Sequence, residues 1–296
     1  MPLRVFALAA LLAVVFVGAA EAAKRPPIKA LIPTAADAKA GPLPTPGDFR
    51  NPDPQNVLVI DTNKGRILVE LQPLAAPITV ERIRTLARKG FYDGLSFFRV
   101  VDDFMDQTGD PLNTGTGGSP LPNLAPEFTF RRGSDTPFTL VSGADGQETG
   151  FVGSLPVISQ PLQLATFTAD GRINAHGDFC QGVGGMARAT SLDSANSQFF
   201  LMRAPSDTLN NTYTAWGAVI AGMDVVRAIK VGEPPAAPMD KMTTVRILAD
   251  IPAASRPKVR VVDTASPWFA AYLARTRTAK GSDFSICDLD LPSDVK

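Results

Sequence analysis

Two apolar runs around a short polar turn mark the start of the folded part of the chain. Residues 57–62 (VLVIDT) and 66–71 (RILVEL) are rich in β-branched side chains, and Asn63-Lys64-Gly65 separates them. This arrangement predicts a β-hairpin. Over residues 77–90 the apolar positions change to helical spacing, with a proline near the start and a glycine at the end, so we expect a helix there.

Further along the chain, short apolar runs alternate with turns rich in glycine and proline. These runs predict strands over residues 95–105, 199–202, 214–220, 245–249 and 259–262. They also predict short helices over residues 222–230 and from Pro267 onward. Many short strands with few helices favour a mainly β fold, either a barrel or a sandwich.

Three segments flank or interrupt this pattern. Residues 23–55 are rich in proline, alanine and glycine, which is typical of a linker or a loosely held arm. Residues 131–178 carry strand-like pieces among many Gly, Ser and Asp residues, and we interpret them as a long loop insertion with hairpin character. Residues 252–296 form a C-terminal extension, which leaves residues 56–251 as the main domain.

Residues 1–22 have the pattern of a secretory signal peptide. Arg4 supplies a positive charge, residues 5–17 are apolar, and Ala20-Glu21-Ala22 is a small-x-small cleavage site. The apolar run is short for a membrane span, which needs about 20 residues, and no later run is long enough. We therefore expect a periplasmic bacterial protein with no membrane span after signal removal; an uncleaved N-terminal anchor is the alternative.

Charge and cysteine content narrow the function further. Lys+Arg 29 and Asp+Glu 29 balance, so the chain lacks the basic surplus of a nucleic-acid-binding protein. The two cysteines are Cys180 and Cys287, and an oxidising compartment permits a disulfide between them. The sequence alone does not bring them within reach of each other.

The usual signatures of metal and phosphate sites are absent from the sequence. His176 is the single histidine, which excludes a multi-histidine metal site and favours a structural role for this residue. The loop Gly115-Thr116-Gly117-Gly118 lacks the Gly-Lys-[Ser/Thr] of a P-loop. The acidic residues of segment 102–110 lack EF-hand spacing and are interpreted as a solvated loop. We therefore expect neither a metal nor a cofactor.

One arginine stands out because it lies on an apolar strand. Arg99 is followed closely by Phe104, Met105 and Gln107 and then by the glycine-rich loop. A guanidinium beside aromatic and thioether groups is costly unless it binds something. Such a surface can hold an apolar ring and donate hydrogen bonds to the amide next to it; a surface salt bridge on a core strand is the alternative.

These residues and a second block of motifs together resemble the cyclophilins, a family of peptidyl-prolyl cis-trans isomerases. The resemblance runs from about Val57 to Ala249, apart from the insertion, and rests on motifs that occur in the family's order: the arginine strand, the Gly-Thr-Gly-Gly loop, Asn196-Ser197-Gln198-Phe199-Phe200 and Gly222-Met223-Asp224-Val225-Val226. It implies a closed eight-stranded antiparallel β-barrel capped by two helices.

The resemblance also implies a role for each matching residue. Arg99 corresponds to the catalytic arginine. The others correspond to the substrate-binding surface: Phe104, Met105, Phe200 and Leu209 to the walls of the proline pocket, Gln107 and Gln198 to groups that hold the peptide backbone, Ala187, Arg188 and Ala189 to the strand that pairs with the substrate, and Tyr213 to a pocket histidine of animal members.

Several positions depart from the family pattern. Phe98 replaces a usual histidine, and Asp102-Asp103 replaces Pro-Gly, both outside the pocket. Arg188 replaces an asparagine whose contact is largely through the backbone. Thr208 stands where many members have a tryptophan that helps to bind cyclosporin, so we expect weak cyclosporin binding.

The expected function is therefore rotation of X-Pro peptide bonds in exported proteins, which assists their folding. The expected partners of the protein are unfolded or partly folded polypeptides that contain proline. The expected reaction needs no covalent step. Two alternatives remain open: a module that binds proline segments or client proteins with little catalysis, and a structural envelope protein held by an uncleaved N-terminus.

Overall fold

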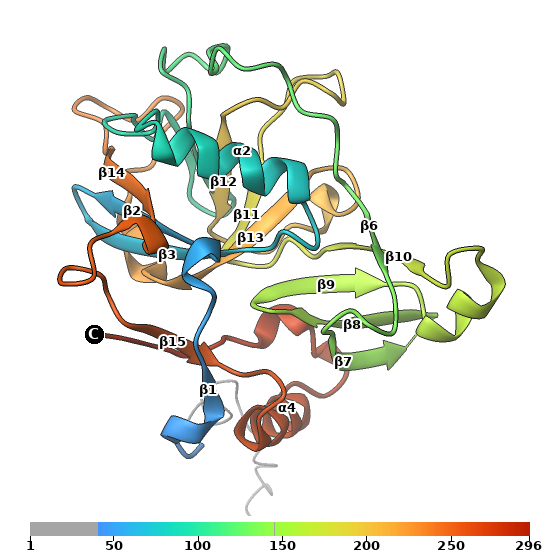
Figure 1. Cartoon of the computed structure of the whole chain (residues 1–296). Helices are drawn as coiled ribbons and strands as arrows, with labels where there is room; N and C mark the ends of the chain where they lie inside the picture. Colours follow the sequence, from blue (N-terminus) through green and yellow to red (C-terminus); the bar gives the residue numbers. More distant parts are fainter. Residues whose placement is uncertain (1–40, 145) are drawn as a thin grey trace, which may run out of the picture. The chain divides into compact units, whose positions relative to one another are not determined.

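The central feature of the fold is an eight-stranded antiparallel sheet (Figure 1). The computed structural model describes residues 41–144 and 146–296. In it the strand order is β14-β2-β3-β13-β11-β12-β5-β4. The bounds are β2 (Val57–Thr62), β3 (Gly65–Leu71), β4 (Arg99–Val101), β5 (Met105–Thr108), β11 (Val183–Met186), β12 (Phe199–Met202), β13 (Ala215–Ala221) and β14 (Met242–Ile247).

The sheet is curled, and its two outer strands, β14 and β4, do not pair with each other as a ladder. A mainly β fold is thus confirmed, but the expected closed barrel is not confirmed. The expected single strand over residues 95–105 is wrong, because a turn at residues 102–104 divides it into β4 and β5. The expected signal peptide and most of the proline-rich arm lie outside the described residues.

The hairpin β2–β3 follows the predicted bounds closely, and both of its faces are buried. Alternate residues enter two different clusters, because successive side chains of a strand point to opposite faces. Leu58, Ile60, Ile67 and Val69 join the core under the first helix, whereas Val57, Val59 and Leu68 pack with Val259 and Val261 of the C-terminal extension. Burial on both faces explains why VLVI is a continuous apolar run.

Two helices pack on the sheet, as the resemblance implies. Helix α2 (Pro77–Arg88) buries Val80, Ile83, Leu86 and Ala87. The N-cap residue of the helix, Ala76, has no side-chain acceptor for the free N–H groups of the first turn. The carboxylate of Glu127 takes this role and accepts hydrogen bonds from the backbone N–H groups of Ile78 (2.9 Å) and Thr79 (2.8 Å). Helix α3 (Met223–Ala228) follows Gly222, whose φ of +89° is in the left-handed region.

The insertion is a sheet: its interpretation as a loop is wrong, but the expected hairpin character is confirmed by the antiparallel pairs β7–β8 and β8–β9. Its five strands have the order β6-β10-β9-β8-β7. They are β6 (Phe130–Arg132), β7 (Thr139–Ala144), β8 (Gln147–Val152), β9 (Leu155–Ser159) and β10 (Ile173–Gly177). Between β9 and β10 the chain forms a 3₁₀ helix, η3 (Leu162–Phe167). Short strands joined by Gly, Ser and Asp turns gave little periodicity to detect.

A third sheet joins the arm to the C-terminal extension. Its order is β1-β15-β16, with β1 (Phe49–Arg50), β15 (Val259–Val262) and β16 (Ser293–Val295). Arg50 donates from Nη1 to Glu70 of β3 (2.6 Å) and from Nη2 to Ser154 of the insertion (3.0 Å). The described end of the arm is therefore anchored, contrary to the expectation of a loosely held segment.

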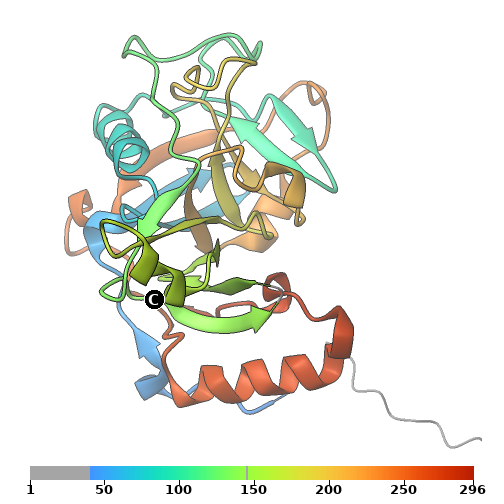
Figure 2. The same cartoon turned by 90° about the vertical axis from the view of Figure 1, so that its right-hand side faces the viewer.

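The extension also provides helix α4 (Pro267–Lys280), which begins at the predicted proline. The helix lies beside the insertion sheet in both views (Figures 1 and 2). Phe269 packs edge-on against Phe151 of β8, with ring centroids 5.7 Å apart. No helix in the described part of the chain is both long and apolar enough to cross a bilayer.

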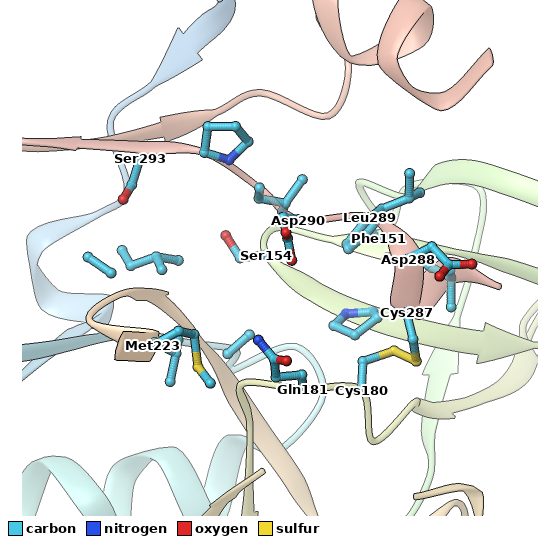
Figure 3. A pocket seen from close by; sticks show the side chains of 18 of the residues that line it. Phe151, Ser154, Cys180, Gln181, Met223, Cys287, Asp288, Leu289, Asp290 and Ser293 are labelled. Atoms are coloured by element: carbon cyan, nitrogen blue, oxygen red, sulfur yellow. A yellow bond between two sulfur atoms is a disulfide. The ribbon is translucent and has the colours of Figure 1, made fainter. Parts of the chain in front are cut away.

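Cys180 and Cys287 form a disulfide that joins the segment between β10 and β11 (Val183–Met186) to the extension. Cys287 lies in the short 3₁₀ helix η7 (Ile286–Asp288). Figure 3 shows the bond at the edge of a cavity of about 590 Å³, lined by β13, the insertion and residues 286–293. The link closes a segment with a sequence separation of 107 residues.

Breaking this long covalent loop should destabilise the fold. We expect Cys287→Ser to lower the free energy of unfolding by about 2–5 kcal/mol, because the unfolded chain regains entropy. Urea denaturation without reductant measures the change. Reductant should lower the stability of the wild type to the same level and leave Cys287→Ser unaffected; equal stability of wild type and variant without reductant would contradict the prediction.

Candidate active site

The residues predicted for the site meet at two adjoining hollows on one end of the curled sheet. Nine of them line a small cavity of about 120 Å³: Arg99, Phe104, Met105, Gln107, Ala187, Arg188, Phe200, Leu209 and Tyr213. Ala189 and Gln198 line the neighbouring hollow of about 520 Å³, together with the glycine-rich loop. The structure thus brings together every residue predicted for the site.

Strand register creates the cavity. Arg99 of β4 lies opposite Gln107 of β5, and Gln107 lies opposite Phe200 of β12. Phe200 in turn lies opposite Gly185 of β11. A Cβ atom on Gly185 would come within 2.3 Å of the Phe200 ring, so only glycine lets the ring cover this strand. Residues far apart in sequence therefore form one row across four strands.

The inner wall of the cavity is apolar and closely packed. Met105, Phe200 and Leu209 are buried. The Phe200 ring contacts those of Phe179 and Tyr213, with centroid distances of 5.9 and 6.0 Å. Rigid aromatic walls of this size suit a small apolar ring, because burying such a group removes apolar surface from water.

A line of polar side chains connects the cavity to the glycine-rich loop. Arg99 Nη1 donates to Gln107 Oε1 at 3.4 Å, Gln107 Nε2 to Gln198 Oε1 at 2.9 Å, and Gln198 Nε2 to the carbonyl of Gly117 at 2.7 Å. These bonds fix both amides beside the guanidinium. The apolar wall and a row of oriented donors thus face the same hollow.

Asp110 organises the glycine-rich loop and is fully buried, so its interpretation as a solvated loop residue is wrong. Its carboxylate accepts backbone hydrogen bonds from Leu112 (2.7 Å), Thr114 (3.0 Å), Gly115 (2.7 Å) and Gly117 (3.2 Å). Burial alone would raise the pKa of Asp110, but these four donors hold it below the usual value. The loop is therefore built around an ionised carboxylate.

Asp106 is also buried, on the face of β5 opposite to Met105 and Gln107. Arg203 donates to its Oδ1 at 3.0 Å, and to the carbonyls of Val226 and Arg227 in helix α3. Oδ2 of Asp106 has no hydrogen-bond partner in the described residues. Burial raises the pKa of Asp106 to about 7, although the bond from Arg203 opposes the shift.

Arg188 and Tyr213 form the rim. The Arg188 guanidinium lies 4.5 Å from the centre of the Tyr213 ring, a cation–π distance. It donates to the carbonyl of Thr212 from Nε (3.2 Å) and Nη2 (3.1 Å), and to that of Ala189 from Nη1 (3.0 Å). Tyr213 thus supplies an aromatic ring at the rim, at the position that corresponds to a pocket histidine in animal members of the family that the sequence resembles.

Other predicted groups lie away from the cavity. His176 is in β10, with Nδ1 3.1 Å from the carbonyl of Gly177. In the described part of the chain, a cluster of potential metal-ligand atoms occurs at Asp178, Cys180 and Cys287, where both sulfurs belong to the disulfide.

One residue of the site was missed by the sequence reasoning. Glu233 accepts a hydrogen bond from Arg99 Nε at 2.6 Å. The two residues are 134 positions apart, and no motif or periodicity around Glu233 distinguishes it from a surface residue.

Comparison with known proteins gives a consistent match. Residues 57–249 match the family described as "Cyclophilin type peptidyl-prolyl cis-trans isomerase/CLD". A "Probable peptidyl-prolyl cis-trans isomerase" of Brucella suis biovar 1 (strain 1330) is 33% identical over 191 residues, 61% of this chain and 74% of the relative. "Peptidyl-prolyl cis-trans isomerase CYP71" of Arabidopsis thaliana is 31% identical over 179 residues, 60% of this chain and 21% of the relative.

A solved structure resembles more of the chain than the family segment. The cyclophilin AquaCyp293 from Hirschia baltica has a TM-score of 0.78 and 33% sequence identity, and the match covers 88% of this chain and 97% of that one. The similarity therefore extends beyond residues 57–249.

The raised pKa of Asp106 predicts an unusual pH dependence of stability. Between its ordinary value of 3.8 and about 7, the folded chain binds more protons than the unfolded chain, so the contribution of Asp106 to stability falls as the pH rises. We expect the difference in free energy of unfolding between the wild type and Asp106→Asn to fall by about 2–4 kcal/mol across this window.

Urea denaturation of both proteins at several pH values measures this difference, because the other titrating groups are common to the two. A difference that instead rises with pH would show that Asp106 titrates below its ordinary value, and the prediction would be wrong.

Proposed function

The chain belongs to the cyclophilin-type peptidyl-prolyl cis-trans isomerases, and from this premise we propose that Arg99 is the catalytic residue of its isomerase site. The observation that carries the proposal is the position of the guanidinium. It lies at the mouth of an apolar cavity, with Nη1 3.4 Å from Gln107 Oε1 and with Nη2 not hydrogen-bonded to any described residue. Donors are therefore available to a bound peptide.

Rotation about a peptide bond is opposed by a barrier of about 18–20 kcal/mol, because resonance makes the C–N bond partly double. The twisted amide has lost that resonance, and its nitrogen regains a lone pair. A hydrogen bond from Arg99 to this nitrogen is stronger in the twisted state than in either planar state, which is what lowers a barrier. Since arginine stays protonated, the step needs no change of protonation state.

The rest of the site holds the substrate while the amide turns. The proline ring enters the cavity walled by Phe104, Met105, Phe200, Leu209 and Tyr213. Gln107 and Gln198 hydrogen-bond to the peptide backbone. Residues 187–189, which follow the end of β11 and line the neighbouring hollow, lie along its path. Thr208, exposed beside Leu209, leaves the rim without the indole that favours cyclosporin, so binding of that drug is weak.

The curled sheet acts as a barrel in this proposal. The backbone N–H of Val100 donates to Gly232 O at 2.8 Å, and that of Phe97 donates to Asp240 O at 2.9 Å. These bonds link the β4 side of the sheet to the segment before β14. They support a barrel of residues 56–251, to which the insertion and the extension 252–296 are added.

We also propose that the enzyme is exported and assists the folding of periplasmic proteins. The signal-peptide pattern of residues 1–22 supports export. The Cys180–Cys287 disulfide agrees with an oxidising compartment. In this setting the substrates are X-Pro bonds of unfolded or partly folded exported polypeptides.

Removing the guanidinium should abolish most of the catalysis. We expect Arg99→Ala to lower kcat/KM on an Ala-Pro peptide by about 10²–10³-fold, the cost of losing one preorganised donor, with an unchanged thermal transition. Arg66→Ala is the matched control and should retain full activity. It removes an exposed arginine of β3 that pairs with Asp61 of β2.

The same assay separates the two classes of function. If the wild type does not accelerate isomerisation above buffer but still binds proline peptides, the chain is a binding module. If Arg99→Ala is as active as the wild type, the catalytic assignment is wrong.

The export proposal is tested by the mass of the intact protein from a periplasmic fraction. We expect a mature chain that begins after about residue 22, because signal peptidase cleaves behind a small-x-small site. A chain in that fraction that still begins at Met1 would support an uncleaved anchor instead.

A further inference from the structure

Glu233 is the partner of the arginine at the site. It lies in the loop between α3 and β14, and its Oε2 accepts a hydrogen bond from Arg99 Nε at 2.6 Å. Both side chains are partly open to solvent, with 39% of Arg99 and 52% of Glu233 exposed. An exposed ion pair adds little to folding stability, so stability does not account for this contact.

The backbone holds Glu233 in place beside Arg99. Gly232, the preceding residue, exchanges two backbone hydrogen bonds with Val100, the residue after Arg99, at 2.8 and 2.9 Å. Gly232 has a φ of +153°, and a Cβ atom there would lie 2.5 Å from Pro235 Cα. Pro234 and Pro235 further restrict the loop, since each fixes its own φ. The carboxylate is thus presented from a closely folded loop.

The contact divides the donors of the guanidinium between protein and substrate. Glu233 takes Nε, and Gln107 lies at long hydrogen-bond distance from Nη1. Nη2 has no hydrogen bond to any residue in the described ranges. Because the guanidinium is planar and rigid, a bond to Nε fixes its rotation, and Nη1 then lies toward Met105 and Gln107 of the cavity wall.

We propose that Glu233 is a positioning residue that orients Arg99 for catalysis, an inference that rests on the proposed role of Arg99. A second effect opposes the first, because the carboxylate cancels part of the positive charge that attracts the twisted amide. Solvent screens that charge effect at so exposed a pair, whereas misorientation of a catalytic donor is costly in rate. Orientation therefore dominates, and loss of Glu233 lowers activity.

The test uses Glu233→Ala in the full chain, because glutamine would keep an amide oxygen that can accept from Arg99 Nε. We expect kcat on an Ala-Pro peptide to fall by about tenfold, because the donor is no longer held in place. KM should change by about twofold or less, because the interaction matters mainly in the twisted state. The thermal transition should be unchanged. Asp170→Ala is the matched control: it removes the partner of Arg131 in an exposed pair of the same 2.6 Å length in the insertion.

A double-mutant cycle distinguishes positioning from an independent effect. In the Arg99→Ala background, Glu233→Ala should cause no further loss, because its effect acts through the guanidinium. The ¹H–¹⁵N signal of Arg99 Nε should exchange slowly with water in the wild type and rapidly in Glu233→Ala, which leaves Nε without its acceptor. Equal losses in both backgrounds would overturn the inference.

The outcomes also separate this inference from the proposed function. If Arg99→Ala is inactive and Glu233→Ala is as active as the wild type, Arg99 stays catalytic and the positioning role of Glu233 is wrong. A higher kcat in Glu233→Ala would likewise overturn it. If Arg99→Ala is fully active, the proposed function itself fails, whatever Glu233→Ala does.

Discussion

The pairing register of β5 with its two neighbours determines the chemistry of the site. On β5, Met105 and Gln107 point into the cavity, whereas Asp106 between them points to the buried face and meets Arg203. A slip by one residue would exchange the two faces. It would place a carboxylate against the apolar wall and bury Gln107, so the ion pair of Asp106 with Arg203 also marks the correct register.

The added segments protect the outer face of this sheet rather than its site. The hairpin β2–β3 buries Val57, Val59 and Leu68 against the extension, so the extension completes a core that the sheet alone leaves exposed. Arg50, Glu70 and Ser154 connect arm, sheet and insertion by side-chain hydrogen bonds, and the disulfide adds a covalent link. The small cavity lies at strands β4, β5, β12 and β11, away from these added segments, and remains open to a peptide.

Local patterns in the sequence predicted the elements that are stabilised locally. The hairpin 57–71, the strands 199–202 and 259–262, and the helix from Pro267 were predicted closely because their periodicity and turn residues are contained in one segment. The insertion was not, since β6 pairs with β10 across a long stretch of sequence and each strand is short. The site residues came from the family resemblance, whereas Glu233 depends on a loop contact that no local pattern encodes.

The two arginines at the cavity differ in the donors that remain available. Arg188 uses Nε, Nη1 and Nη2 on the carbonyls of Thr212 and Ala189 and stacks on Tyr213. Arg99 has a firm partner at Nε alone. Three of the five N–H groups of Arg188 are thus committed to fixed carbonyls, and these bonds hold the guanidinium in place at the rim. Under the proposed function, geometry rather than charge therefore favours Arg99 over Arg188 as the group that donates to the twisting amide.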